Sequence, residues 1–330
     1  MSRTIYEVAK KANVSISTVS RVLNNSGYAS EATRAKVIVA TEELGYRQNR
    51  IAKSLRNQQS NFIGLLVPDI ANEFFASLAS SIELTLRHYG YNLFLCNTRE
   101  SQEIENHYIE SLLDNQVQGI IIVSAGRKPK PSLFKCTTPI VLVDRLGPEL
   151  NKLNSIFIES ENEKGGVLAA KAFLKRGAKR FVFLGDQRNM RAMSHRKKGF
   201  SETLFSHGVS ETDYCEMMIP VSAVIARHEV KDFYEAFPFD AIFCGTDNIA
   251  LGAMRGLYDI GLEIPTDVQL IGFDGIQLGE FTVPGISTIR QDTHLMGKVS
   301  SESIVKMIRG DESRGTILLP VEFIARGTTK

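Results

Sequence analysis

The sequence predicts an α/β chain in which a three-helix helix-turn-helix head and a hinge precede two doubly wound parallel-sheet lobes. The 330 residues exceed what one hydrophobic core usually organises. Apolar residues recur at helical spacing within the first 46 residues, and short apolar runs alternate with amphipathic stretches from residue 61 onward. The alternation starts again near residue 180, which indicates a second lobe.

Charge is distributed unevenly along the chain. Residues 1–60 hold ten Lys/Arg and four Asp/Glu, a net charge of +6, whereas residues 61–330 hold 29 and 33, a net charge of −4. A basic head on a mildly acidic body indicates that the head meets a polyanion, most simply nucleic acid. A solvated basic face is the alternative that charge alone leaves open.

Two short helices joined by a one-turn break are predicted for the start of the head. Apolar positions recur at three- and four-residue intervals over residues 5–12 and again over residues 19–23. Thr4, three residues before Glu7, forms a capping-box pattern for the first helix. Ser15 is a suitable N-cap for the second helix, because its hydroxyl can accept from free amides of the next turn.

The predicted second helix exposes a short polar and basic face, formed by Ser15, Ser17, Thr18 and Arg21. A third helix is expected from Ser30 to about Leu44, where Gly45 supplies a stop. In a major groove, arginine can address guanine bidentately, while small hydroxyl groups bond to bases or phosphates. The head therefore indicates a DNA-binding helix-turn-helix, with an ordinary three-helix bundle as the alternative.

Residues 47–60 form the predicted hinge. Ile51, Ala52 and Leu55 have helical spacing but offer almost no apolar face, so an isolated helix would be marginal here. The segment could fold on meeting DNA or a second copy of the chain, with Leu55 as an apolar wedge in the minor groove. A plain flexible linker is the alternative.

Short apolar runs predict the buried parallel strands of the two lobes. They lie at residues 61–67, 91–95, 119–123 and 140–143, and then at 180–184, 241–244 and 268–273. Amphipathic stretches predict helices near residues 73–89, 101–115, 162–176, 193–207, 224–236 and 248–260. Two successive doubly wound units would turn their strand C-termini towards a shared crevice, where ligands bind.

Polar residues follow most of these strands and are candidate ligand contacts. They are Asp69, Asp144, Arg145, Asp186, Thr246, Asp247, Asp274, Gln291 and Asp292. Carboxylates accept from adjacent hydroxyl groups and arginine donates to ring or hydroxyl oxygens, so the set suits a polyhydroxylated ligand. Phe74 and Phe75 could stack on the apolar face of a sugar ring. For any single residue, turn chemistry or helix capping is the alternative.

Several classes of protein lack their signatures in this sequence. The apolar runs are far shorter than the roughly 18 to 20 residues that cross a bilayer, and the N-terminus has no signal pattern, so we expect a cytoplasmic protein. The four cysteines, Cys96, Cys136, Cys215 and Cys244, are spaced too far apart for a zinc site or a disulfide framework. No nucleophile or phosphate-loop motif is present, so we expect no enzyme activity, cofactor or metal.

Residues 4–9, 14–24 and 45–55 resemble the DNA-binding head and hinge of the lac repressor/galactose repressor family. In that family a proline usually precedes Asn49, whereas Gln48 stands here. The resemblance implies that Ile16, Ser17 and Arg21 read bases. It implies that phosphates or the DNA backbone are held by Thr4, Tyr6, Ser15, Thr18, Asn24, Ser30, Thr33 and Asn49. In the hinge, Ala52 and Leu55 are the implied DNA contacts, with Leu55 as the minor-groove wedge.

The body resembles the effector domain of the same family, which is itself similar to periplasmic sugar-binding proteins. Residues 68–75, 117–121, 143–145, 246–254, 271–274 and 287–291 carry the resemblance. It implies effector contacts at Asn72, Phe75, Asp144, Arg196, Asp247, Asp274 and Gln291. Relatives often have asparagine before Asp247, where this chain has Thr246.

These observations predict a sequence-specific DNA-binding transcriptional regulator, a repressor of carbohydrate-utilisation genes that a sugar effector releases. The expected units are the head (1–46), the hinge (47–60) and an effector-binding and dimerisation domain (61–330). The expected partners are double-stranded operator DNA, the sugar and a second copy of the chain, and no membrane.

Within the family, residues 27–28, 144–145 and 271–275 are similar to sucrose-type regulators of Gram-positive bacteria. Three alternatives stay open: a catabolite regulator with a phosphorylated carrier protein as corepressor, a purine-type regulator whose ligand strengthens DNA binding, and a sugar receptor that does not bind DNA.

Overall fold

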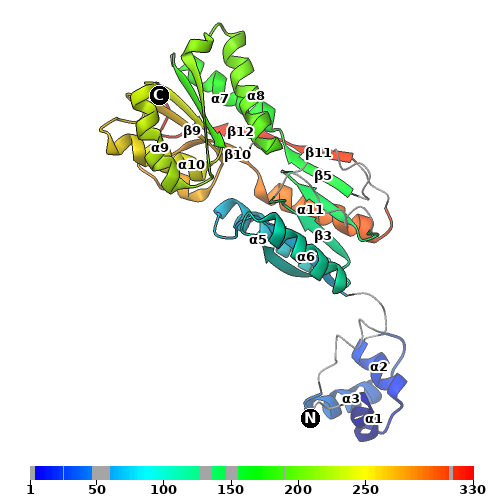
Figure 1. Cartoon of the computed structure of the whole chain (residues 1–330). Helices are drawn as coiled ribbons and strands as arrows, with labels where there is room; N and C mark the ends of the chain where they lie inside the picture. The colour runs from blue at the N-terminus through cyan, green and yellow to red at the C-terminus, as the bar shows by residue number, and fades with distance from the viewer. Residues whose placement is uncertain are drawn as a thin grey trace. The chain divides into compact units, whose positions relative to one another are not determined.

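The chain forms two compact units, residues 1–59 and 60–330, each described here by itself (Figure 1). The computed structural model describes residues 4–24, 26–46, 60–125, 136–145, 155–188, 190–311 and 315–330. A helical unit precedes a larger α/β unit, so the predicted fold class is confirmed. No helix among the described residues is long and apolar enough to cross a membrane.

Within its described residues the head has three helices, α1 (Ile5–Ala12), α2 (Ile16–Asn24) and α3 (Glu31–Glu43). The predicted caps are formed: the Glu7 carboxylate accepts from the Thr4 amide at 2.7 Å, and the Ser15 hydroxyl accepts from the Thr18 amide at 3.1 Å. Asn13, in the left-handed region at φ 53°, provides the one-turn break. A small core holds the helices together, formed by Val8, Ala9, Ala12, Val19, Val22, Val37 and Ala40.

The first lobe is a parallel sheet with the order β11-β5-β4-β3-β1-β2. Its strands are β1 (Phe62–Val67), β2 (Asn92–Asn97), β3 (Gly119–Ile122), β4 (Ile140–Val143), β5 (Ser155–Ser160) and β11 (Gly315–Leu319). Its helices are α5 (Glu73–His88), α6 (Gln102–Asp114) and α11 (Thr293–Ile308). The central strands are buried, as the apolar runs predicted.

The second lobe is a sheet with the order β12-β10-β9-β8-β6-β7, parallel except where β12 pairs antiparallel with β10. Its strands are β6 (Phe181–Asp186), β7 (Tyr214–Ile219), β8 (Ala241–Cys244), β9 (Gln269–Asp274), β10 (Ser287–Gln291) and β12 (Val321–Ile324). Its helices are α7 (Asn162–Lys175), α8 (Arg191–Ser206), α9 (Ala223–Ala236), α10 (Asp247–Asp259) and the 3₁₀ turns η3 (Glu211–Asp213) and η4 (Gln277–Glu280).

The two lobes are not strictly successive along the chain, which corrects the prediction of two successive units. After β10 the chain returns to the first lobe, where α11 packs on α5 and β11 pairs with β5. β12 then re-enters the second sheet, so the described chain passes between the lobes after β5, after β10 and after β11. Local sequence pattern predicts that a strand exists, but not which sheet it joins.

Close packing of α7 on α8 sets the position of α8 in the second lobe. A Cβ added to Gly199 would collide with the carbonyl oxygen of Glu163, and one added to Gly166 would collide with that of Arg196. Both glycines are therefore required for this backbone approach. The approach fixes α8, and with it Arg196, against the end of the sheet.

Candidate DNA-recognition face and ligand-binding crevice

The outer face of α2 carries the side chains that the sequence assigned to DNA. Ser15, Ile16, Ser17 and Arg21 are exposed, while Val19 and Val22 on the opposite face are buried. The Ser15 hydroxyl oxygen lies 2.7 Å from that of Ser17 and 2.8 Å from that of Thr18. These hydroxyls are therefore grouped in the first turn of the helix, the part that enters a major groove in helix-turn-helix proteins.

The residues expected to hold phosphates or the DNA backbone differ in their exposure. Thr4, Tyr6 and Ser30 are exposed, whereas Thr18, Asn24 and Thr33 are half-buried. The Asn24 amide donates to the Ser20 carbonyl at 2.8 Å, and the Ser30 hydroxyl accepts from the Thr33 amide at 3.3 Å. Asn49, Ala52 and Leu55 lie outside the described residues. Tyr28, which is 91% exposed between α2 and α3, was not among the expected contacts.

In the body, the strand ends of both lobes meet around a narrow cavity of about 40 Å³. The first lobe contributes Asn72, Phe74, Phe75, Asp144 and Arg145, and the second contributes Met190, Ala192, Met193, Arg196, Val221, Thr246 and Asp274. The crevice expected from doubly wound topology is present. Five of the seven expected effector residues line this cavity: Asn72, Phe75, Asp144, Arg196 and Asp274.

Arg196 lies at the centre of this crevice and is 3% exposed. Its Nε donates to Asn162 Oδ1 at 2.8 Å and its Nη1 donates to the Gly245 carbonyl at 2.6 Å. The guanidinium lies 3.6 Å from the Asp274 carboxylate and 4.0 Å from the Asp144 carboxylate, and it stacks on the Phe273 ring at 3.6 Å. Because Asp144 belongs to the first lobe, Arg196 connects the two lobes electrostatically.

Three buried polar atoms of the body have no hydrogen-bond partner among the described residues. They are Asp144 Oδ1, Ser160 Oγ and Gln291 Oε1. An unpaired buried acceptor costs about 1–3 kcal/mol, so each favours an arriving donor such as a ligand hydroxyl. Asp144 and Asp274 also have positive φ angles of 64° and 115°. Residues other than glycine are strained there, and such strain clusters at functional sites.

Burial changes the titration of the crevice carboxylates. Desolvation, aided by the charges of Asp247 and Asp144, raises the pKa of Asp274 to about 8, against the opposing effect of Arg196. Desolvation also raises the pKa of Asp247 to about 7. For Arg196, burial lowers the pKa although the carboxylates oppose it. The crevice thus holds more acidic groups than its single buried guanidinium can neutralise.

Asp247 and Gln291 are the two expected effector residues that do not line the narrow cavity. Asp247 Oδ1 accepts from the Thr288 hydroxyl at 2.8 Å, and Oδ2 accepts from the amides of Gly275 and Ile276 at 2.8 and 2.9 Å. In this position it braces the loop after Asp274, and its expected effector contact stays a prediction.

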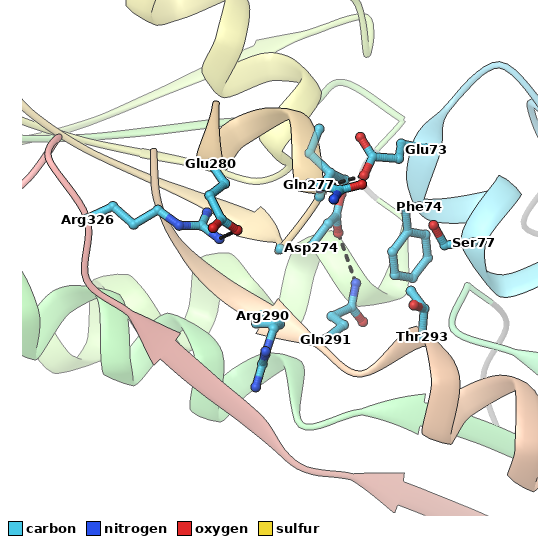
Figure 2. Close-up of a pocket in the computed structure, with 12 residues that line it drawn as sticks. Glu73, Phe74, Ser77, Asp274, Gln277, Glu280, Arg290, Gln291, Thr293 and Arg326 are labelled. Carbon is cyan, nitrogen blue, oxygen red and sulfur yellow. Dashed lines mark hydrogen bonds and ion pairs between the residues drawn. The ribbon is translucent and has the colours of Figure 1, made fainter. Parts of the chain in front are cut away.

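Gln291 lines a second cavity of about 250 Å³, which shares Phe74 and Asp274 with the narrow one (Figure 2). The Gln291 amide donates to Asp274 Oδ1 at 2.9 Å. Gln291 is also the last residue of β10, where the chain leaves the second lobe. It thus joins the crevice carboxylate to a crossing between the lobes.

An ionic network that the sequence analysis missed joins the lobes near Arg145. The Glu100 carboxylate pairs with Arg145 at 2.7 Å and with Arg188 of the second lobe at 2.6 Å, and Arg188 also pairs with Asp186 at 2.6 Å. Burial would raise the pKa of Glu100, but the two guanidinium groups lower it below its ordinary value. No motif marks Glu100; its positive φ of 56° is visible only in the structure.

Metal chemistry has no visible site in the part of the chain that the structure describes, because no group of three His, Cys, Asp or Glu residues there could hold an ion. Cys96 and Cys244 are buried thiols, whereas Cys136 and Cys215 are half-buried. Burial raises the pKa of Cys96 to about 11, so this thiol is poorly reactive.

Comparison with known proteins agrees with this geometry at both ends of the chain. Residues 4–49 match the family described as bacterial regulatory proteins, lacI family, and residues 60–327 match the periplasmic binding proteins and sugar binding domain of the LacI family. The resemblance found in the sequence is thereby confirmed for the head and for the body.

Individual relatives extend over the whole chain. A ribose operon repressor of Halalkalibacterium halodurans is 35% identical over 333 residues, 99% of this chain and 97% of the relative. A sucrose operon repressor of Lactococcus lactis is 33% identical, covering 96% and 97%. A crystal structure of the lac repressor dimer bound to operator and the anti-inducer ONPF has 26% identity and a TM-score of 0.89, covering 100% and 99%. The chain belongs to the LacI family of bacterial regulatory proteins.

Proposed function

We propose that this protein is a homodimeric DNA-binding repressor whose grip on a pseudo-palindromic operator is controlled by a small neutral sugar. The observation that carries the proposal is the crevice, where Arg196 lies between the Asp144 and Asp274 carboxylates of opposite lobes. A two-fold dimer presents two heads and therefore fits a two-fold operator. The protein acts on genes in the cytoplasm, binds rather than converts its ligand and is not an enzyme.

The chemistry of the crevice favours a hydroxyl-rich, uncharged effector. Two of the unpartnered buried atoms, Asp144 Oδ1 and Gln291 Oε1, can only accept hydrogen bonds, and the Ser160 hydroxyl can accept one. Sugar hydroxyl groups supply donors for the two that belong to cavity-lining residues, Asp144 and Gln291, whereas a phosphate would bring further acceptors next to Asp274. The aromatic rings of Phe74 and Phe75 provide the apolar surface on which a sugar ring stacks.

We infer the size of the effector from the cavities and from the relatives. The narrow cavity of about 40 Å³ is well below the roughly 300 Å³ at the lower end of ligand pockets, so the lobes must part to admit a sugar and then close around it. A compact monosaccharide demands the smallest opening. The relatives named for ribose and for sucrose are 35% and 33% identical, too close to choose between them, and the cavity size favours the smaller sugar.

The switch follows from this change of lobe spacing. A sugar that binds one lobe arrangement better than another shifts the population towards it, and the paired heads then fit the operator differently. The coupling is reciprocal, so operator DNA must weaken the sugar by the same factor by which the sugar weakens DNA. At the operator, Arg21, Ser17 and Ile16 read bases, while the remaining head residues and the hinge position the DNA backbone.

Operator selection from a randomised palindromic duplex pool, with and without a panel of sugars, tests the proposal. The panel holds D-ribose, D-fructose, sucrose and their phosphates, and operator release by one neutral monosaccharide is the expected result. Release by a phosphorylated sugar would contradict the effector class. A ligand that tightens binding, or a need for a phosphorylated carrier protein, would establish a corepressor instead. Failure to enrich any duplex would refute the DNA-binding role.

A further inference from the structure

The loop that follows the crevice carboxylate Asp274 is held by two other carboxylates, one from each lobe. Its four successive amides, those of Gly275, Ile276, Gln277 and Leu278, all donate to carboxylate oxygens. Asp247 of the same lobe accepts the first pair. Glu73, the first residue of α5 in the opposite lobe, accepts the second pair at 2.5 and 3.1 Å.

This loop needs external support. Asp274 at φ 115° and Gly275 at φ 79° are both outside the right-handed region, and strained backbone persists only where its surroundings fix it. Gln277 and Leu278 begin the short η4 turn, so their amides have no partner within the turn itself. A carboxylate is a strong acceptor for such amides, because hydrogen bonds to a charged group are shorter and stronger than neutral ones.

Glu73 stands in the same segment as the first lobe's expected effector contacts. It follows Asn72 and precedes Phe74 and Phe75, all of which line the crevice. Figure 2 shows Glu73 and Phe74 together on one side of the larger cavity, with the Glu73 carboxylate against Gln277 and the Asp274 carboxylate nearby. A rigid displacement of α5 away from the second lobe would therefore release the effector contacts and the Asp274 loop together.

We propose that Glu73 is a positioning residue for the effector response: by accepting the Gln277 and Leu278 amides across the crevice, it fixes the loop that presents the Asp274 carboxylate. Asp247 accepts from the Gly275 and Ile276 amides whether the lobes are open or closed, because Asp247 and the loop both belong to the second lobe. Glu73 holds the other half only when the lobes are together. The inference deepens the proposed function, on which its effector part rests.

Amide hydrogen exchange, resolved for single residues in the full-length chain, tests this role without any effector. In the variant Glu73→Gln, which keeps the size but loses the charge and one acceptor, we expect the Gln277 and Leu278 amides to exchange about tenfold faster. The Gly275 and Ile276 amides, held by Asp247, should keep their protection. Glu103→Gln is the matched control, because Glu103 is an exposed acid in the first turn of α6.

Calorimetric titration with D-ribose provides the second readout. Glu73→Gln should weaken D-ribose about tenfold, which corresponds to about 1.4 kcal/mol, while Glu103→Gln should not change it. Equal protection of all four amides in both variants, uniform loosening of all four in Glu73→Gln, or unchanged D-ribose affinity would overturn the role of Glu73. If the unmodified chain does not bind D-ribose, the choice of sugar fails, and the exchange result alone decides the role of Glu73.

Discussion

Replacement of Arg196 by methionine separates the ligand-binding role of the crevice from the DNA-binding role of the head. Methionine fills similar space but removes the guanidinium, and leaves Asn162 Oδ1 and the Gly245 carbonyl without their donor. Each newly unpaired buried acceptor costs about 1–3 kcal/mol. The Asp144 and Asp274 carboxylates also lose the cation that lies between them, and breaking a buried pair of this kind costs roughly 3–5 kcal/mol in total.

We expect the variant to remain folded, since a domain of this kind is stable by about 5–15 kcal/mol, but with a clearly lower free energy of unfolding. Its affinity for the effector should fall by about 10- to 100-fold, because at least one charge-assisted hydrogen bond of about 1.5–3 kcal/mol is lost and the repulsion between the crevice carboxylates is no longer offset. Operator affinity without sugar should stay within about threefold, because Arg196 is not part of the head.

Calorimetry with the sugar and fluorescence anisotropy with the labelled operator measure the two affinities. Arg227→Met is the matched control, because Arg227 lies on α9 and pairs with Asp259 at the surface, where an ion pair contributes little to stability. Arg196→Lys should recover part of the effector affinity through its charge, but not the two hydrogen bonds to Asn162 and Gly245. Retained sugar affinity in Arg196→Met would refute the crevice as the effector site.

Three further changes test the head, the crevice acids and the packing of α8. Arg21→Ala should weaken operator binding by about 1–3 kcal/mol but leave scrambled duplex almost unchanged; equal losses on both would exclude base reading. Asp274 has a folded pKa of about 8, above its unfolded value, so its stabilising contribution is complete below about pH 4 and is lost as the pH rises towards 8. Denaturation across this window should show a stability decline that is shallower in Asp274→Asn, and parallel curves would exclude the raised pKa. Gly199→Ala should destabilise the chain by about 1–3 kcal/mol through collision with the α7 backbone, and an unchanged unfolding midpoint would argue against that packing.

Apolar runs in the sequence predict several of the strands correctly, and two of these are buried throughout. The run at residues 119–123 becomes β3, which is buried throughout, and the run at residues 140–143 becomes β4 with the same bounds. Five strands were not predicted: β5, β7, β10, β11 and β12. In β11 only one of five residues is buried, and its partner β5 lies about 160 residues earlier in the chain. Pairing at such a distance leaves no periodic trace in either segment.

Some of the crevice residues could be located from the sequence, and others could not. Asp144 and Asp274 could be located from the rule that ligands bind at the carboxyl ends of parallel strands. Arg196 lies within α8 rather than at a strand end, so only the family resemblance indicated it. The loop-holding roles of Asp247 and Glu73 depend on amides 28 and 204 residues further along the chain, which no local pattern specifies.

Asp274 is the point at which ligand binding, lobe closure and loop geometry meet. Its carboxylate accepts a hydrogen bond from the side-chain amide of Gln291, the residue at which β10 ends, and lies 3.6 Å from the guanidinium of Arg196. Its backbone begins the strained loop that Asp247 and Glu73 hold from opposite lobes. Asp144 Oδ1 and Gln291 Oε1 are buried acceptors without a hydrogen-bond partner among the described residues, which opposes the closed arrangement. A sugar supplies the missing donors only when both lobes surround it, so its binding energy is realised in the closed arrangement alone. Differential stabilisation of one arrangement is what an effector needs in order to change the fit of the paired heads to DNA.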